Sequence, residues 1–365
     1  MTTVLRASSP AEFLGIVPSL AGFTPTQSIV LLPFHGSRTY GAMRIDLPRP
    51  DIAPEDFARH AIGLVSKVDG ADAIAIVVYT DEDPLRTSDG LVLPLSVQVD
   101  ELIGCADDAG HRIVDALCVT PGGWSSYLDD EPVLEPLPAT DADAGDQHAG
   151  VELPAVEFVD KEHVGRALRD IDVLFDRERR GLLDGTEDPQ AITALALLEH
   201  VPCFFEMLLE HPDDQSPSVT AALLWCLNRP LLRDVALAQW ASSLADGIRT
   251  LEAQCAFADG RGAIPEDLGS VFLGQGPTPD PDRLQLALSA VRLAAARAPR
   301  MARPAPLTAA AWLSWALGRS THAEHYLQLV REIDPEYGLA ALLSTIVGAG
   351  MLPDWTFRRG PGLGR

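Results

Sequence analysis

The stretch from Gly22 to Pro48 constrains the fold more than any other part of the sequence, because it holds two neighbouring strand patterns. Residues 29–32 are an unbroken apolar run with β-branched side chains, which is typical of a strand covered on both faces. From Gly41 to Leu47 apolar and polar residues alternate, which predicts one buried and one polar face. The link between them, residues 35–39, is short, polar and contains a glycine. We therefore expect two antiparallel neighbouring strands.

Further helices and strands extend this pair into an α/β domain. Ser9 and Pro10 predict a short helix that ends before Pro18, because serine caps helix N-termini and proline suits the first helical position. Amphipathic helices are expected to begin at Pro54 and at Leu95. The remaining patterns predict strands at 73–79 and 113–119 and a last edge strand at 124–127. For residues 1–128 we predict an α/β sandwich with a mixed sheet.

The second half of the chain has a helical period throughout. Residues 129–150 contain seven acidic residues and no basic ones, so we place an acidic Pro/Ala/Gly-rich linker at 129–155. An all-α domain is predicted at 156–355 and a disordered tail at 356–365. Residues 312–333 resemble half of a tetratricopeptide-like hairpin, but an irregular helical bundle is slightly favoured over a true solenoid. Helix starts are expected at four pairs of a capping residue and proline: Asp188-Pro189, Ser216-Pro217, Asp280-Pro281 and Asp334-Pro335.

The net charge and the cysteine pattern restrict the classes of partner and the cellular compartment that we expect. The net charge is -24, and residues 1–150 alone hold 8 Lys/Arg against 23 Asp/Glu, a net of -15. Such acidity argues against nucleic acid and anionic membranes as partners. The five cysteines are widely spaced with no C-x-x-C pair, so we expect buried apolar residues in a reducing compartment. The N-terminus lacks the apolar core of a signal peptide, and residues 338–352 are too short to span a membrane and suggest a core helix. We expect a cytoplasmic protein.

Polar residues on the strand pair are the first candidate site. Arg44 and Asp46 lie on the polar face of one strand, and Gln27 and Ser28 lie at the start of its neighbour. If this face lines a crevice, Arg44 could donate two hydrogen bonds to a polar ligand and Asp46 could accept one. The alternative is a surface ion pair that keeps an edge strand soluble.

Two other sets of residues are candidate binding sites. Trp124 and Tyr127 could form an aromatic recognition patch, or they could pack on the sheet. His322 and His325 share a helix face and could ligate a metal, but two ligands do not make a zinc site. A solvated helix face is the simpler interpretation. The sequence contains no phosphate loop, H-E-x-x-H or G-x-S-x-G motif, so we predict no catalytic residues, no metal and no cofactor.

Three segments carry a resemblance to a known family. They resemble the actinobacterial family known as domain of unknown function 4192. The segments are AEFLGIVPSLAGFTPTQSIVLLPF, RIDLP and AWLSWALGRSTHAEHYLQLVREIDPEYGLA. The resemblance covers nearly the whole chain and implies no particular activity. It also implies cysteines shortly after the segment WSSY, whereas here LDDEPVLEP follows Tyr127. No metal or redox role of those cysteines is therefore carried over.

The absence of catalytic motifs and the helix-rich second half favour a non-catalytic binding or adaptor protein. Its ligand would be a protein partner or a small polar molecule. One alternative is an enzyme of unrecognised, hydrolase-like type with a site at the domain interface near Arg44 and Asp46. A second alternative is a structural subunit of a larger assembly. The oligomeric state is left open.

Overall fold

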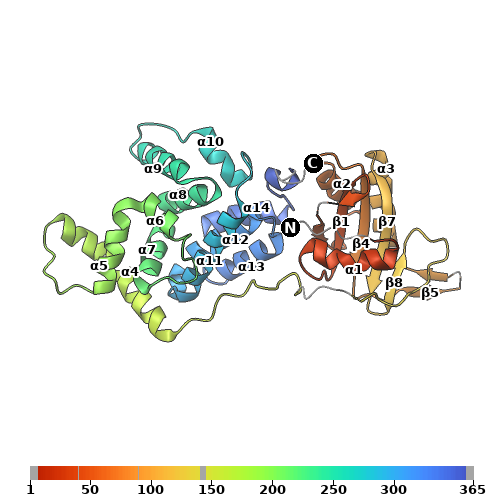
Figure 1. The fold of residues 1–365 in the computed structure, drawn as a ribbon, viewed down its shortest axis with the longest axis horizontal. Helices are drawn as coiled ribbons and strands as arrows, with labels where there is room; N and C mark the ends of the chain where they lie inside the picture. Colours follow the sequence, from red (N-terminus) through yellow and green to blue (C-terminus); the bar gives the residue numbers. More distant parts are fainter. Residues whose placement is uncertain (1–6, 40, 89, 140–144, 359–365) are drawn as a thin grey trace. The chain divides into compact units, whose positions relative to one another are not determined.

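A computed structural model describes residues 7–39, 41–88, 90–139 and 145–358 (Figure 1). The chain divides into two compact units: unit 1 comprises Met1–Gly150 and Phe357–Arg365, and unit 2 comprises Val151–Thr356. Unit 1 contains a sheet and three helices, whereas unit 2 is helical. The predicted combination of an α/β region and an all-α region is therefore confirmed. Most of the predicted tail, residues 359–365, lies outside the described residues, and a short 3-10 helix occupies Asp354–Phe357.

Unit 1 is built on a six-stranded mixed sheet. Strand β1 pairs antiparallel with β4 on one side and with β2 and β3 on the other, β4 pairs parallel with β7, and β7 pairs antiparallel with β8. The expected antiparallel pair at the start of the chain is thus confirmed. The strands are β1 (Ser28–His35), β2 (Arg38–Thr39), β3 (Met43–Asp46), β4 (Ala73–Tyr79), β7 (Arg112–Thr120) and β8 (Gly123–Ser126).

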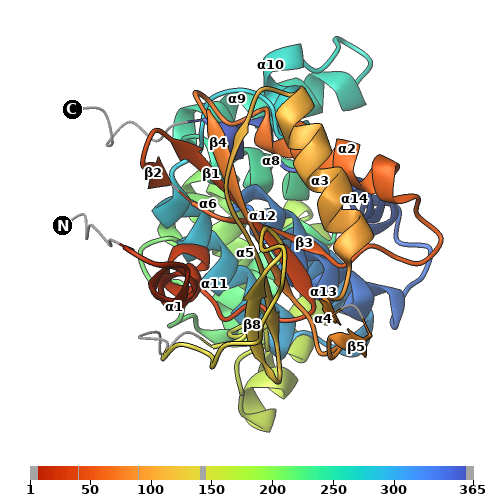
Figure 2. The same ribbon diagram turned by 90° about the vertical axis from the view of Figure 1, so that its right-hand side faces the viewer.

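Helices cover both faces of this sheet (Figure 2). On one face, α1 (Pro10–Ala21) buries Leu14 and Val17 against alternate residues of β1, β4 and β7. On the other face, α2 (Pro54–Val65) and α3 (Ser96–Asp108) pack against the remaining alternate residues. Because side chains of a strand point alternately to opposite faces, the apolar residues of β1 from Ile29 to Phe34 and those of β4 fill both layers.

The predicted end of the first helix was wrong. Helix α1 continues through Pro18 to Ala21, and Gly22, with φ of 80°, ends it. Proline inside a helix removes one backbone hydrogen bond. Here Val17 and Pro18 are both buried, so packing on the sheet outweighs that loss. A small hairpin of β5 (Leu85–Thr87) and β6 (Gly90–Val92) was not predicted, because strands of three residues leave little periodic signal.

Part of the predicted linker packs on unit 1. The backbone of Glu135 forms two hydrogen bonds with that of Trp124, with N to O distances of 2.9 and 2.8 Å. These bonds lie along the free side of the edge strand β8. Gly123 permits the approach, since a Cβ atom there would lie 2.3 Å from the Glu135 carbonyl oxygen. The segment from Leu134 to Glu135 therefore covers the sheet edge.

Unit 2 has one continuous core and no strand among its described residues. Its largest fully buried side chains include Trp240, Trp312, Trp315, Tyr326 and Phe205. The α-helices are α4 (Phe158–Arg179), α5 (Pro189–Leu197), α6 (Val201–Met207), α7 (Pro217–Leu227), α8 (Pro230–Ala241), α9 (Leu244–Ala258), α10 (Glu266–Gly269), α11 (Pro281–Arg297), α12 (Pro304–Ala316), α13 (Ser320–Arg331) and α14 (Gly338–Gly348).

Three of the four expected helix starts are confirmed. Asp188, Ser216 and Asp280 each accept a hydrogen bond from a backbone N–H of the following helix, and proline occupies its first position. The start at Asp334 was wrong. There the Asp334 carboxylate accepts from the Glu336 backbone N–H at 3.1 Å and forms a turn, and α14 begins only at Gly338.

Two burial expectations also need correction. The predicted core helix α14 buries only Ala340 and Leu343, and its Leu342 side chain is 67% exposed. Among the cysteines, Cys203 and Cys255 are exposed rather than buried, because each lies on the outer side of its helix. In the part of the chain that the structure describes, no helix has both the length and the apolar character needed to cross a bilayer.

Candidate functional site

Three of the predicted site residues lie in one transverse row of the unit 1 sheet: Ser28 of β1, Asp46 of β3 and Trp124 of β8. The row runs through Asp46, Ser28, Tyr79, Val119 and Trp124, each opposite the next on a neighbouring strand. It lies at the carboxyl ends of the parallel strands β4 and β7. Ligands of open α/β sheets bind outside the carboxyl ends of their strands. The row therefore marks the end of the sheet where a ligand is expected.

Gln27 stands at this end in an unusual backbone conformation. Its φ is 44°, and of the described residues other than glycine only Leu95 also has a positive φ. The side-chain amide of Gln27 donates to the Asp81 carboxylate at 2.9 Å, and the Asp81 backbone N–H donates back to the Gln27 amide oxygen at 3.4 Å. Gln27 thus ties the start of β1 to the loop that follows β4.

Arg44 and Asp46 form the ion pair that the sequence suggested. The Arg44 guanidinium donates to Asp46 at 2.5 Å and, through Nε, to the Gln147 side-chain oxygen at 2.8 Å. Gln147 also accepts from the Thr26 backbone N–H at 3.3 Å. The Arg44 side chain is 13% exposed and that of Asp46 is 82% exposed. Arg44 is therefore directed at groups of its own unit, whereas Asp46 faces solvent.

The sheet separates the two aromatic candidates. Trp124 packs on the α1 face, whereas Tyr127 packs on the face covered by α2 and α3. The Tyr127 hydroxyl donates to the Pro94 carbonyl oxygen at 2.6 Å, and burial raises its pKa above the ordinary value. The two residues do not form one recognition patch.

Two buried polar atoms in the transverse row lack a hydrogen-bond partner within the described structure. They are the Ser28 hydroxyl oxygen and the Trp124 indole nitrogen. Buried polar groups are nearly always hydrogen-bonded, so each such atom calls for an explanation. Both lie on the α1 face, the same face as Arg44.

Sequence reasoning missed the acidic residues that follow β4. Asp81, Glu82 and Asp83 follow this buried strand after Thr80 and are exposed. With Asp46 they form what we call the acidic edge of unit 1. Four carboxylates at one end of a sheet favour ligands with positive charge or several hydrogen-bond donors. Three consecutive acidic residues after a buried apolar strand were the available signal.

The histidine pair lies in unit 2. His322 and His325 are on α13, and the ring of His325 lies against that of Tyr326 with centroids 5.6 Å apart. Within the described ranges, no group of three or more His, Cys, Asp or Glu side chains is arranged to hold a metal ion.

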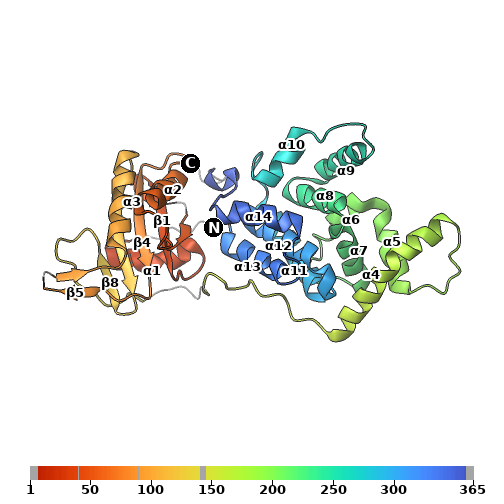
Figure 3. The ribbon, with the colours of Figure 1, turned by 180° about the vertical axis from the view of Figure 1, so that it is seen from behind.

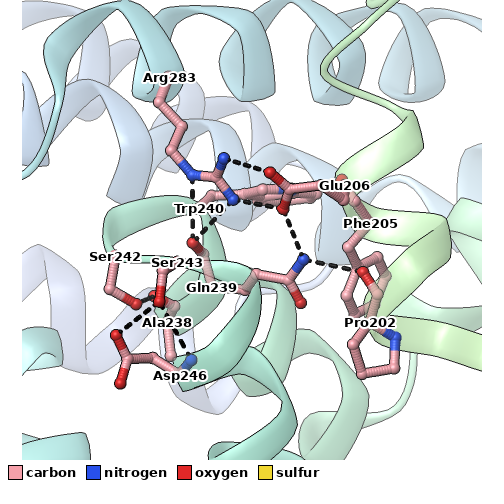
Figure 4. A network of polar contacts seen from close by, with 10 residues as sticks. All are labelled: Pro202, Phe205, Glu206, Ala238, Gln239, Trp240, Ser242, Ser243, Asp246 and Arg283. Carbon is pink, nitrogen blue, oxygen red and sulfur yellow. Dashed lines mark hydrogen bonds and ion pairs between the residues drawn. The ribbon is translucent and has the colours of Figure 1, made fainter.

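A second polar cluster lies inside unit 2 (Figure 4). Arg283 of α11 contacts both carboxylate oxygens of Glu206 on α6 at 2.5 Å. Gln239 of α8 is fully buried and donates to Glu206 at 2.9 Å and to the Pro202 carbonyl oxygen at 2.8 Å. Hydrogen bonds from Arg283 hold the pKa of Glu206 below its ordinary value. These contacts join three helices, and sequence reasoning missed them because the residues are far apart in the chain.

A comparison with models of protein families gives a match. The model of a family described as a domain of unknown function (DUF4192) matches residues 10–258 and 280–354. Neither the curated proteins nor the solved structures contain a significant match.

Proposed function

The chain belongs to the DUF4192 family, and we propose that it is a non-catalytic binding protein whose acidic edge engages a basic segment of a protein partner. The family description names no activity, so support for this proposal comes from unit 1.

The backbone conformation of Gln27 carries the proposal. For a residue other than glycine, a backbone conformation in the left-handed region costs about 1–3 kcal/mol of stability. Such a conformation persists only where the surrounding structure fixes it. Such residues cluster at ligand-binding sites. Here the conformation directs the Gln27 amide to Asp81, which holds the first carboxylate of the acidic edge in place.

The charge of unit 1 defines the expected ligand class. Residues 1–150 carry a net charge of -15, so the field around the acidic edge attracts cations. The side chain of Asp46 is exposed and can accept hydrogen bonds from lysine or arginine. Exposed charges of this kind increase the association rate and the specificity of a complex. Added salt weakens their attraction to the partner.

Binding of labelled peptides to the full chain tests the proposal. We expect lysine- and arginine-rich peptides to bind in a fluorescence anisotropy assay, more weakly at higher salt, whereas acidic peptides do not bind. Asp81→Asn and Asp46→Asn should each weaken binding about two- to fivefold, the range for exposed ion pairs. Asp100→Asn, an exposed carboxylate on α3, is the matched control and should change nothing.

Other outcomes would select the alternatives. If no basic peptide binds, or if Asp100→Asn weakens binding as much as Asp81→Asn, the acidic edge is not the binding surface. A cationic metabolite that competes with the peptides would indicate a small ligand at the same place. Turnover of any metabolite by the purified chain would show that the protein is an enzyme and would refute the proposal.

A further inference from the structure

Two arginines of unit 2 lie close together, and neither has an acidic partner among the described residues. Arg292 is on α11, and Arg319 immediately precedes α13. Helix α12 packs against both α11 and α13 (Figures 1 and 3), and the Arg319 guanidinium donates to Gln285 of α11 at 2.7 Å. Burial lowers the pKa of Arg319, and the nearby charge of Arg292 lowers it further. The two positive charges therefore repel each other.

Neither guanidinium forms an ion pair with a carboxylate of the described chain. Arg319 contacts the neutral Gln285, and Arg292 donates to the backbone oxygen of Glu152. Other arginines of the same unit are paired, as Arg283 is with Glu206. With 52 acidic and 28 basic residues, the chain has carboxylates in excess. An unneutralised pair of guanidiniums is therefore unexpected here, and an anion from solution would remove the repulsion.

Two buried donors beside the pair are also unused. Tyr326 is fully buried, its hydroxyl lies beside Arg292, and no described residue accepts the hydroxyl proton, because a guanidinium can only donate. Burial raises the pKa of Tyr326, so the hydroxyl keeps its proton. The Nε of Arg292 is buried and likewise has no partner among the described residues. An oxygen atom placed here would satisfy donors that the protein leaves unpaired.

The start of α13 adds to the attraction for an anion. The helix begins at Ser320, and Arg319 at its N-cap provides no side-chain hydrogen bond to the first turn. A helix N-terminus carries a partial positive charge and favours phosphate groups. The helix end and both guanidiniums therefore act in the same direction.

We propose that Arg292, Arg319 and Tyr326, at the start of α13, bind a doubly charged oxyanion of the phosphate type. Arginine suits this ligand because its planar guanidinium can donate two parallel hydrogen bonds to phosphate oxygens. The site is independent of the acidic edge, since it lies in the other unit and has the opposite charge.

Calorimetric titration of the full chain with inorganic phosphate tests the site. Ionic strength is held constant with sodium chloride, so that general screening does not change. We expect saturable binding to the wild type and at least tenfold weaker binding to Arg319→Ala, because a charged hydrogen-bonding partner is lost. Arg166→Ala removes the same charge from an exposed position on α4 and should bind as the wild type does.

Absence of saturable binding to the wild type, or equal affinity of Arg319→Ala and Arg166→Ala, would overturn the proposal. A second variant guards against misfolding. Tyr326→Phe keeps the buried ring and removes only the unpaired hydroxyl, so it should fold normally and bind phosphate more weakly. If phosphate protects Tyr326→Phe and Arg319→Ala against thermal unfolding as much as the wild type, the cluster does not bind the anion. Comparison of inorganic phosphate with a phosphate monoester distinguishes the free ion from an esterified ligand.

Discussion

Replacing Gly247 with alanine should destabilise unit 2 strongly, although alanine is the better helix former. Gly247 lies inside α9, against α8. A Cβ atom there would lie 2.1 Å from the amide oxygen of Gln239, 2.6 Å from its Cδ and 2.8 Å from its Cβ. Gln239 cannot simply turn away, because it is fully buried and its amide donates to Pro202 and Glu206.

The expected loss follows from three terms. Breaking the two hydrogen bonds of Gln239 costs about 1 kcal/mol each. Overpacking of a dense core adds about 2 kcal/mol. Alanine in place of glycine in a helix returns about 1 kcal/mol. The free energy of unfolding should therefore fall by about 3 kcal/mol, which lowers the urea midpoint by about 1–3 M for a typical dependence on denaturant.

Urea unfolding monitored by tryptophan fluorescence measures this change. Five of the six tryptophans, all except Trp124, belong to unit 2, so the signal reports mainly on that unit. Gly348→Ala, at the end of α14, is the matched control, because an added Cβ there has no neighbour within 4 Å. It should be neutral or slightly stabilising.

A double-mutant cycle identifies the cause. In a Gln239→Ala background the two closest contacts vanish and only the 2.8 Å contact with Cβ remains. The additional cost of Gly247→Ala should then fall by at least about 1 kcal/mol. The reasoning fails if Gly247→Ala is as stable as the wild type, or if its cost is the same in both backgrounds.

Three further predictions concern other parts of the chain. Gln27→Gly should be more stable than Gln27→Ala by about 1 kcal/mol in chemical denaturation, because glycine adopts the positive φ without strain; equal stability would show that no strain is stored there. The pKa of Glu206 is lowered mainly by hydrogen bonds from Arg283, so its contribution to stability is complete above its ordinary pKa of 4.5 and is lost as the pH falls through the lower folded value. The stability difference between the wild type and Glu206→Gln should therefore shrink in urea melts below that range, and a constant difference would contradict the assignment. Tyr127→Phe should lose about 1 kcal/mol by leaving the Pro94 carbonyl oxygen without its buried donor, and an unchanged melting temperature would show that this hydrogen bond contributes little.

Secondary structure was predictable where local signals were strong. The apolar run of β4 and the alternation of β3 are properties of adjacent residues, so the sequence alone predicts them. The capped starts of α5, α7 and α11 are equally local. The errors at Pro18 and Asp334 have a common origin. Each local signal is only a preference that the folded structure can override. At Pro18 burial of the helix on the sheet outweighed the tendency of proline to end a helix, and at Asp334 a turn replaced the expected helix start.

The side-chain clusters were less predictable, because they join residues that are distant in the sequence. Gln27 and Asp81 are 54 positions apart, and Glu206 and Arg283 are 77 apart. Periodicity places each residue on a face of its own element but does not identify its partner on another. Arg44 and Asp46 are neighbours on one strand, and this pair was anticipated as a contact.

The backbone pairing of Glu135 with Trp124 has a practical consequence for producing unit 1 by itself. A fragment that stopped at Leu128 would retain every strand of the sheet but expose the unpaired N–H and C=O groups of β8. Open strands of this kind template pairing between molecules, so the shorter fragment should aggregate. A fragment extended to Gly150 would keep both the Glu135 segment and Gln147, and is the one to express.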